Sequence, residues 1–105
     1  MFGLRNSDLR MIKEVFQNHP GVSEAFIFGS RAMGNYKEGS DVDIALKGDM
    51  SPQTLIAISA ELNEVIPLPY KFDVIAYSQI LSQELLHHID QHGISFYSQR
   101  SSSPT

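Results

Sequence analysis

The sequence predicts one α/β domain, built from a small mixed β-sheet with helices packed on one of its faces. Segments with helical periodicity alternate with short apolar segments typical of strands, which is the pattern of α/β proteins. The 105 residues, of which 42% are hydrophobic and 19% charged, suffice for one core. We expect the domain to occupy residues 1–99 and the polar segment 100–105 to be a disordered tail.

Three segments have the apolar spacing of amphipathic helices, over about residues 6–18, 51–66 and 78–93. Asn6 or Ser7 is the expected cap of the first helix. Ser51 followed by Pro52 marks the start of the second, because proline is favoured at the first helical position. The residues expected to face the core are Leu9, Ile12, Val15 and Phe16, then Leu55, Ile58, Leu62 and Val65, then Ile80, Leu81, Leu85 and Ile89.

Short apolar segments between these helices predict strands at residues 24–28, 42–46 and 71–76, with residues 94–97 as a fourth strand or a packed tail. A helical turn over residues 30–33 and a polar loop over residues 35–40 separate the first two strands. These two strands are too far apart for a tight hairpin but can still pair. With all helices on one face, the other face of the sheet is expected to be open for chemistry.

Two aspartates, Asp41 and Asp43, stand one residue apart at the start of an otherwise apolar strand. Side chains alternate across a strand, so both carboxylates point the same way, about 6.5–7 Å apart. Buried carboxylates are costly unless a cation meets them, and this spacing suits two cations. Asp73, on the third strand, can complete a three-carboxylate cluster if the two strands pair. Oxygen ligands select hard cations, which predicts Mg²⁺ or Mn²⁺.

Gly29 and Ser30 follow the first strand and predict a phosphate site. Glycine allows a ligand to approach the backbone closely, and a helical turn after a strand points N–H groups at an anion. The Ser30 hydroxyl adds a donor, and Arg31 either adds positive charge or is simply exposed. Because Mg²⁺ is usually held by a few carboxylates together with substrate phosphates, the two halves of the pattern support each other.

Taken singly, these features have simpler explanations. A Gly-Ser pair after a strand is usually a turn, an Asp-x-Asp pattern is often a cap or a solvated edge, and one aspartate in an apolar strand can protect a sheet edge from aggregation. Their combination is less ordinary. Gly-Ser followed at fixed spacing by Asp-x-Asp is expected by chance in roughly one chain in a thousand of this size.

The composition excludes several function classes. The net charge is −4 and no basic cluster is present, which argues against direct binding of nucleic acid. No apolar run approaches the roughly 18 residues of a membrane helix, and the N-terminus lacks the apolar core of a signal peptide. The chain has no cysteine, so disulfides and thiolate metal sites are excluded and a cytoplasmic location is expected.

Three histidines, His87, His88 and His92, lie in the last predicted helix. His88 and His92 are four residues apart and can share a metal, but no third ligand is evident. The simpler interpretation is imidazoles near a helix C-terminus, where positive charge is favourable. We therefore assign them no role from the sequence.

The stretch GSRAMGNYKEGSDVDIAL resembles the signature of the DNA polymerase β-like nucleotidyltransferase superfamily. The matching residues are Gly29-Ser30, then ten residues, then Asp41-Val42-Asp43. The stretch is most similar to the minimal nucleotidyltransferase (MNT) branch, often the antitoxin partner of a HEPN-domain toxin. The similarity covers about residues 4–97, including element order and Asp73, and implies a polymerase β palm-like fold.

The resemblance also implies a mechanism. Asp41 and Asp43 would bind two Mg²⁺ ions that hold the triphosphate of ATP. Asp73 would bind the catalytic metal and help to activate the attacking hydroxyl, while Gly29 and Ser30 would seat the β and γ phosphates. AMP would then pass to a tyrosine of the HEPN toxin in a hetero-oligomer.

Two alternatives stay open. The first is an antitoxin that neutralises its partner by binding alone, with a metal site that is vestigial or regulatory. The second is an enzyme that modifies a small molecule such as an aminoglycoside, which would need a homodimer to build the acceptor pocket.

Overall fold

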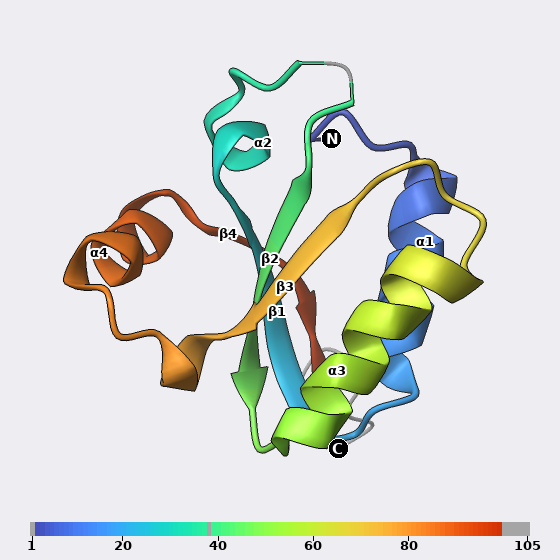
Figure 1. Ribbon diagram of the computed structural model, residues 1–105. Helices are drawn as coiled ribbons and strands as arrows, with labels where there is room; N and C mark the ends of the chain where they lie inside the picture. The colour runs from blue at the N-terminus through green and yellow to red at the C-terminus, as the bar shows by residue number, and fades with distance from the viewer. Residues whose placement is uncertain (1, 38, 100–105) are drawn as a thin grey trace.

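The computed structural model describes residues 2–37 and 39–99, so the tail expected at residues 100–105 lies outside the described residues. The elements are α1 (Asn6–Gln17), β1 (Val22–Phe28), α2 (Ser30–Met33), β2 (Val42–Gly48), α3 (Pro52–Ala60), the π-helical turn η1 (Glu61–Val65), β3 (Phe72–Ala76), the 3₁₀ turn η2 (Tyr77–Gln79), α4 (Gln83–His92) and β4 (Ile94–Ser98) (Figure 1). The predicted α/β class is confirmed. No helix within the described ranges is both long and apolar enough to cross a membrane.

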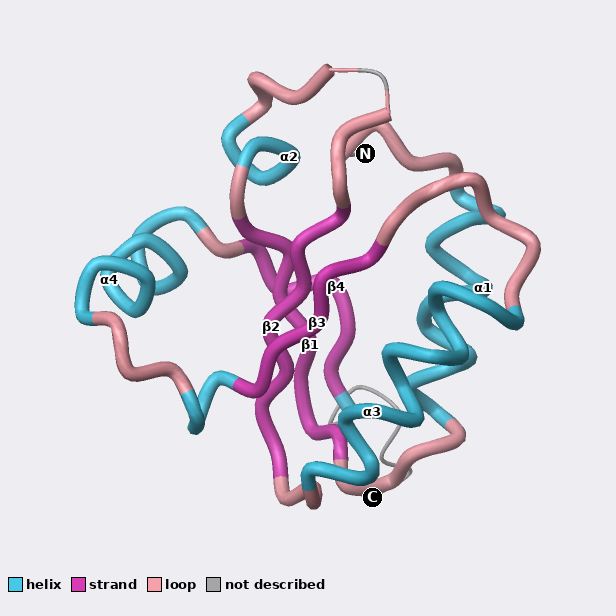
Figure 2. Tube along the Cα trace, viewed as in Figure 1, coloured by secondary structure: helices cyan, strands magenta, loops and turns pink. Residues whose placement is uncertain are grey.

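The four strands form one mixed sheet in the order β3-β2-β1-β4, drawn in magenta in Figure 2. β1 pairs antiparallel with β2 and with β4, whereas β2 and β3 are parallel. The first two strands, for which the sequence left pairing open, do pair, and the fourth segment is a strand rather than a packed tail.

Two helices, α1 and α3, cover one face of this sheet, on the right in Figure 1. The core between them and the sheet contains the fully buried side chains Ile12, Phe16, Val42, Ile44, Leu46, Ile58 and Leu62. Each such side chain contributes about 1.5–3 kcal/mol through its removal from water. The predicted alternation in β2, with Val42, Ile44 and Leu46 facing the helices, is confirmed and leaves Asp43 on the other side of the strand.

In one respect the sheet differs from the expectation, because the helices are not confined to one face. α4 lies on the opposite side of the sheet from α1 and α3 (Figure 1). Its buried Ile89 packs with Phe28 and Ala45 in a second, smaller core. Ala45 lies between Ile44 and Leu46, which face α1 and α3, so its side chain points to the opposite face of the sheet. That face is therefore also partly apolar, and α4 shields it from water. The face expected to be open is therefore partly enclosed by α4.

The last helix begins later than predicted. Ser82 caps it, since its Oγ accepts the Leu85 N–H at 3.2 Å, and Tyr77–Gln79 form a separate turn instead of the first helical residues. Leu81 precedes this cap, so helical spacing does not apply to it, and it is 93% exposed rather than buried. Val65, at the end of η1, is also exposed.

The start of α1 also differs from the prediction, because Arg5 rather than Asn6 or Ser7 is its cap. The Asp8 carboxylate accepts the Arg5 backbone N–H at 3.1 Å, and it also accepts the Tyr70 hydroxyl at 3.0 Å. Burial raises the pKa of Asp8, but the hydrogen bonds from Arg5 and Tyr70 outweigh it and hold the pKa below its usual value. This carboxylate thus ties α1 to the segment that leads into β3.

Candidate functional site

Asp43 and Asp73 are direct partners in the parallel ladder between β2 and β3. Phe72 and Val74, on either side of Asp73, both pack on the core beneath α1 and α3. Asp73 therefore projects from the opposite face of the sheet, as Asp43 does, and neighbouring strands lie about 4.8 Å apart. The predicted convergence of these two carboxylates on one face is confirmed by the register.

Asp41 lies two residues before Asp43, just outside β2, and is exposed. Burial raises the pKa of Asp43, and the negative charges of Asp73 and Asp41 raise it further. The positive charge of Arg31 acts in the opposite direction. The ionised form of Asp43 is therefore costly in the free protein, and a cation placed among the three carboxylates would relieve this cost.

The donor set fits a hard divalent cation, since it consists of carboxylate oxygens. Within the described residues, no three or more His, Asp or Glu side chains are close enough together to hold a metal ion as they stand. Asp41 and Asp73 are both exposed, so their side chains are free to rotate.

Gly29 forms a sharp corner between β1 and α2, with φ 75° and ψ −154°. This backbone conformation is essentially restricted to glycine. A Cβ at this position would also collide with Asp43 Oδ2. The group that lies against Gly29 in the structure is the carboxylate of Asp43, and the approach of a phosphate to this glycine stays a prediction.

Ser30 is the first residue of α2, so the predicted helical turn after the corner is confirmed. Arg31, in the same turn, is buried rather than exposed, and its hydrogen bonds to Phe2 and Ser40 all go to backbone carbonyls. Nη1 donates to Phe2 at 2.8 Å, and Nη2 donates to Ser40 at 2.7 Å. Because Ser40 directly precedes Asp41, Arg31 anchors the loop that carries the first carboxylate.

The Arg31 guanidinium is enclosed by two aromatic rings. It lies 5.2 Å from the ring centroid of Tyr36 and 5.3 Å from that of Tyr70. These contacts lie beside a cavity of about 480 Å³, which Arg31 lines together with Lys37 and other residues. A role for Arg31 at the phosphates stays a prediction, and the geometry gives it an anchoring role in addition.

His88, for which the sequence indicated no role, contacts the glycine corner. The backbone N–H of Gly29 donates to His88 Nε2 at 3.0 Å, and the imidazole lies edge-on to Phe28 with 6.1 Å between ring centroids. A signal existed in the sequence, because His88 is three residues from Leu85 and adjacent to Ile89, which places it on the inward side of the helix. The other member of the suggested metal pair, His92, contacts His88 with its ring tilted by 44° and 5.3 Å between ring centroids.

Asn63 is a second residue that sequence reasoning missed. Its Oδ1 accepts the Phe72 N–H at 2.8 Å, and its Nδ2 donates to the Phe72 carbonyl at 3.0 Å. The amide therefore satisfies both backbone groups of the residue directly before Asp73. No sequence pattern predicts this contact, because it depends on the π-helical turn that carries Asn63.

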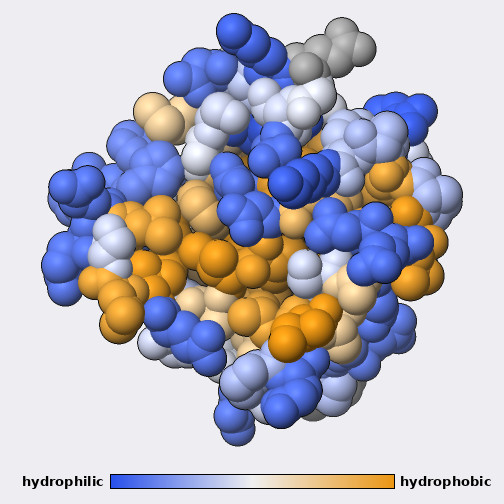
Figure 3. Space-filling model, in the orientation of Figure 1, coloured by the Kyte–Doolittle hydropathy of each residue, from blue (hydrophilic) through white to orange (hydrophobic). Residues whose placement is uncertain are grey.

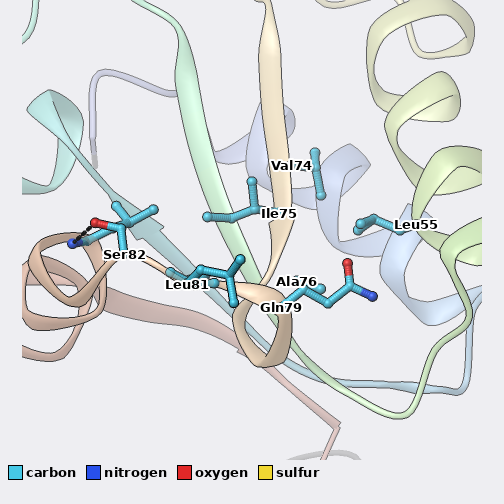
Figure 4. A pocket seen from close by; sticks show the side chains of 9 residues that line it. Leu55, Val74, Ile75, Ala76, Gln79, Leu81 and Ser82 are labelled. Carbon is cyan, nitrogen blue, oxygen red and sulfur yellow. Dashed lines mark hydrogen bonds between the residues drawn. The ribbon is translucent and has the colours of Figure 1, made fainter.

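An apolar hollow of about 300 Å³ lies further along β3 (Figure 4). Leu55, Ile75 and Leu85 line it, together with residues of the segment that leads into α4. Figure 3 shows that apolar surface gathers across the middle of this side of the molecule. The three aspartates do not line this hollow.

A mixed sheet carries two in-register aspartates on its parallel strand pair, beside a strand–glycine–helix corner. The sequence model of the family described as "Polymerase beta, Nucleotidyltransferase" matches residues 10–102. The chain therefore belongs to the polymerase β nucleotidyltransferase family. A search of curated protein sequences found no match.

Solved structures share the fold at low sequence identity. A chain in a crystal structure of a toxin–antitoxin pair with AMP-PNP is 19% identical, with a TM-score of 0.69 over 93% of this chain and 77% of that one. A chain in a complex of a tri-AMPylated Shewanella oneidensis HEPN toxin with an MNT antitoxin is 16% identical, with a TM-score of 0.68 over 93% and 76%. A chain of the MntA-HepT toxin–antitoxin is 15% identical, with a TM-score of 0.68 over 92% and 75%.

Proposed function

We propose that this protein is a Mg²⁺-dependent nucleotidyltransferase that transfers AMP from ATP to a tyrosine hydroxyl of a HEPN-domain toxin and so acts as an antitoxin. The observation that carries the proposal is the in-register pair of Asp43 and Asp73, on one face of the sheet, beside the Gly29 corner. Membership of the family supports nucleotidyl transfer. The AMPylated toxin in one of the similar complexes supports the acceptor.

Asp41, Asp43 and Asp73 are the residues that would hold the metal. Bound Mg²⁺ would neutralise charge on the triphosphate and on the departing pyrophosphate. Asp43 supplies the half-buried carboxylate whose ionised form is costly without a cation. Asp41 and Asp73 supply exposed carboxylates on either side of it, one along the strand and one across the ladder.

The other residues position the substrates. Gly29 and Ser30 would seat the terminal phosphates, and Arg31 fixes the loop before Asp41. The exposed carboxylate of Asp73 can accept the proton of the tyrosine hydroxyl as a general base. The hydroxyl oxygen then bonds to the α-phosphorus, the bond from this phosphorus to the β-phosphate bridge breaks, and pyrophosphate leaves.

The test combines the protein with ATP labelled at the α-phosphate, Mg²⁺ and the product of the adjacent gene. We expect label on a tyrosine of the partner with wild type, and a loss of about two orders of magnitude or more with Asp43→Asn or Asp73→Asn. Asp49→Asn is the matched control, because Asp49 is an exposed carboxylate in the turn after β2.

The same variants separate catalysis from neutralisation by binding. If Asp43→Asn forms the complex and protects cells from the toxin as well as wild type does, the antitoxin works by occlusion and the proposal is wrong. Protection that is lost while the complex still forms supports transfer. Resistance to an aminoglycoside on expression of this chain alone would instead favour a small-molecule acceptor.

A further inference from the structure

The imidazole of His88 connects α4 to both residues that precede Ser30. Nε2 accepts the Gly29 N–H at 3.0 Å, and the ring packs edge-on against the buried Phe28. In this hydrogen bond Nε2 is the acceptor, a role that an imidazole nitrogen has only when it carries no proton. A side chain distant in sequence thus holds the glycine corner through a directional bond.

The corner needs to be held because glycine has more backbone freedom than any other residue. Its φ of 75° and ψ of −154° are only one of the conformations open to it. Two groups border this backbone: the carboxylate of Asp43, which occupies the space where a Cβ would stand, and the imidazole of His88, which takes the N–H. Of these two side chains, His88 is the one that accepts a hydrogen bond from the Gly29 N–H.

We propose that His88 is a positioning residue of the nucleotide site, which holds Gly29 so that Ser30 and Asp43 keep the geometry that receives a triphosphate. This inference rests on the proposed function, because it concerns the same site. His88 acts through Gly29 and takes no part in the bond-making step. Its loss leaves Ile89 to anchor α4, so the helix stays in place while the corner loosens.

The test compares His88→Ala and His88→Gln with His87→Ala. Glutamine retains an oxygen that can accept the Gly29 N–H, and His87 is the exposed neighbour on the same helix. We expect His88→Ala to raise the KM for ATP about five- to tenfold, the range for loss of one hydrogen bond, with a smaller change in kcat. His88→Gln should recover most of this loss, and His87→Ala should match wild type.

Two measurements do not depend on transfer. Amide hydrogen exchange at Gly29 should be faster in His88→Ala than in His87→Ala, and the affinity for a non-hydrolysable ATP analogue with Mg²⁺ should fall by about the same five- to tenfold factor. The ¹⁵N shift of His88 Nε2 in the wild type should be that of an unprotonated acceptor.

The outcomes separate this inference from the proposed function. If wild type transfers nothing but the analogue affinity and Gly29 exchange change as expected, the function is wrong and His88 still positions the site. If wild type transfers and His88→Ala equals His87→Ala in KM and exchange, His88 has no positioning role. A fall in thermal stability without rescue by glutamine, or no binding of the analogue by wild type, also overturns the inference.

Discussion

Asp43 and Asp73 face each other across the only parallel strand pair among the described residues, at the level where β1 turns through Gly29 into α2. Two carboxylates on neighbouring strands repel each other, and one of them is partly buried. An arrangement that lowers stability in this way is typical of a site whose ligand supplies the missing positive charge.

The pKa of Asp43, raised by burial and by the charges of Asp73 and Asp41, predicts a pH-dependent effect of substitution. A carboxyl whose pKa is higher in the folded protein than in the unfolded chain stabilises the fold when protonated. This contribution is complete below the usual value of 3.8 and is lost as the pH rises through the folded-state pKa.

Asp43→Asn should therefore raise the free energy of unfolding relative to wild type at about pH 7 and change it little near about pH 3.5. Urea denaturation in metal-free buffer at the two pH values measures this, with Asp49→Asn as control. If Asp43→Asn is less stable than wild type at neutral pH, then burial and the charges of Asp73 and Asp41 do not make the ionised Asp43 carboxylate costly to the fold.

Gly29→Ala should destabilise the fold by about 1–3 kcal/mol and abolish transfer, because alanine is strained at this backbone conformation and collides with the Asp43 carboxylate. Gly34→Ala is the comparison variant, since Gly34 has φ 82° and ψ 4°, a left-handed conformation that other residues can adopt, and a methyl group there would extend into open space. We expect a smaller loss of unfolding free energy at Gly34, because only Gly29 combines a glycine-restricted backbone with the contact to Asp43. Equal losses in both variants would contradict a special requirement for glycine at Gly29.

Asn63→Asp should weaken the start of β3. Aspartate keeps an acceptor for the Phe72 N–H but loses the donor to the Phe72 carbonyl, which costs about 1–2 kcal/mol. We also expect slower transfer, because Asp73 directly follows Phe72, whose backbone Asn63 holds. Chemical denaturation and a transfer assay measure the two effects, and Asn35→Asp, in an exposed loop, is the control. Unchanged transfer together with lowered stability would restrict Asn63 to a structural role.

Ile89→Ala should cost about 2–4 kcal/mol of stability, because Ile89 is the buried residue of α4 and its removal leaves a cavity. Leu81→Ala should change stability by less than about 0.5 kcal/mol, since Leu81 is 93% exposed. Thermal or urea unfolding measures the loss of stability in each of the two variants. A large loss at Leu81 would show that it is buried and that the helix begins where the sequence predicted.

The sequence predicted the elements and the two facing carboxylates because both depend on local periodicity. Alternation in β2 places Asp43 opposite Val42 and Ile44, whatever surrounds the strand. The sequence left the pairing of β2 with the strand of Asp73 as a condition, and the parallel register is seen only in the structure. The periodicity within each strand requires no knowledge of distant contacts, whereas the pairing does.

Apart from the cap of α1, which depends on the local contact between Arg5 and Asp8, the main errors and omissions involve contacts between distant segments. The last helix, expected from residue 78, begins after Ser82, and its buried Ile89 packs with Phe28 from a strand about sixty residues earlier in the chain. His88 and Asn63 act on backbone groups of Gly29 and Phe72, which carry no side-chain signature. Whether the metal and phosphate roles follow from the aspartates and Gly29-Ser30 stays a prediction.

The position of β1 between β2 and β4 has a consequence for synthesis on the ribosome. Glu24 pairs with Lys47 on one side and with Ser98 on the other. One edge of β1 therefore stays unpaired until β4, more than sixty residues later in the chain, has been synthesised. Distant pairings are slow to form, and an unpaired strand edge is a template for aggregation. A nascent chain that stalls before residues 94–98 emerge would hold its central strand half-paired, which makes it a natural client for chaperones.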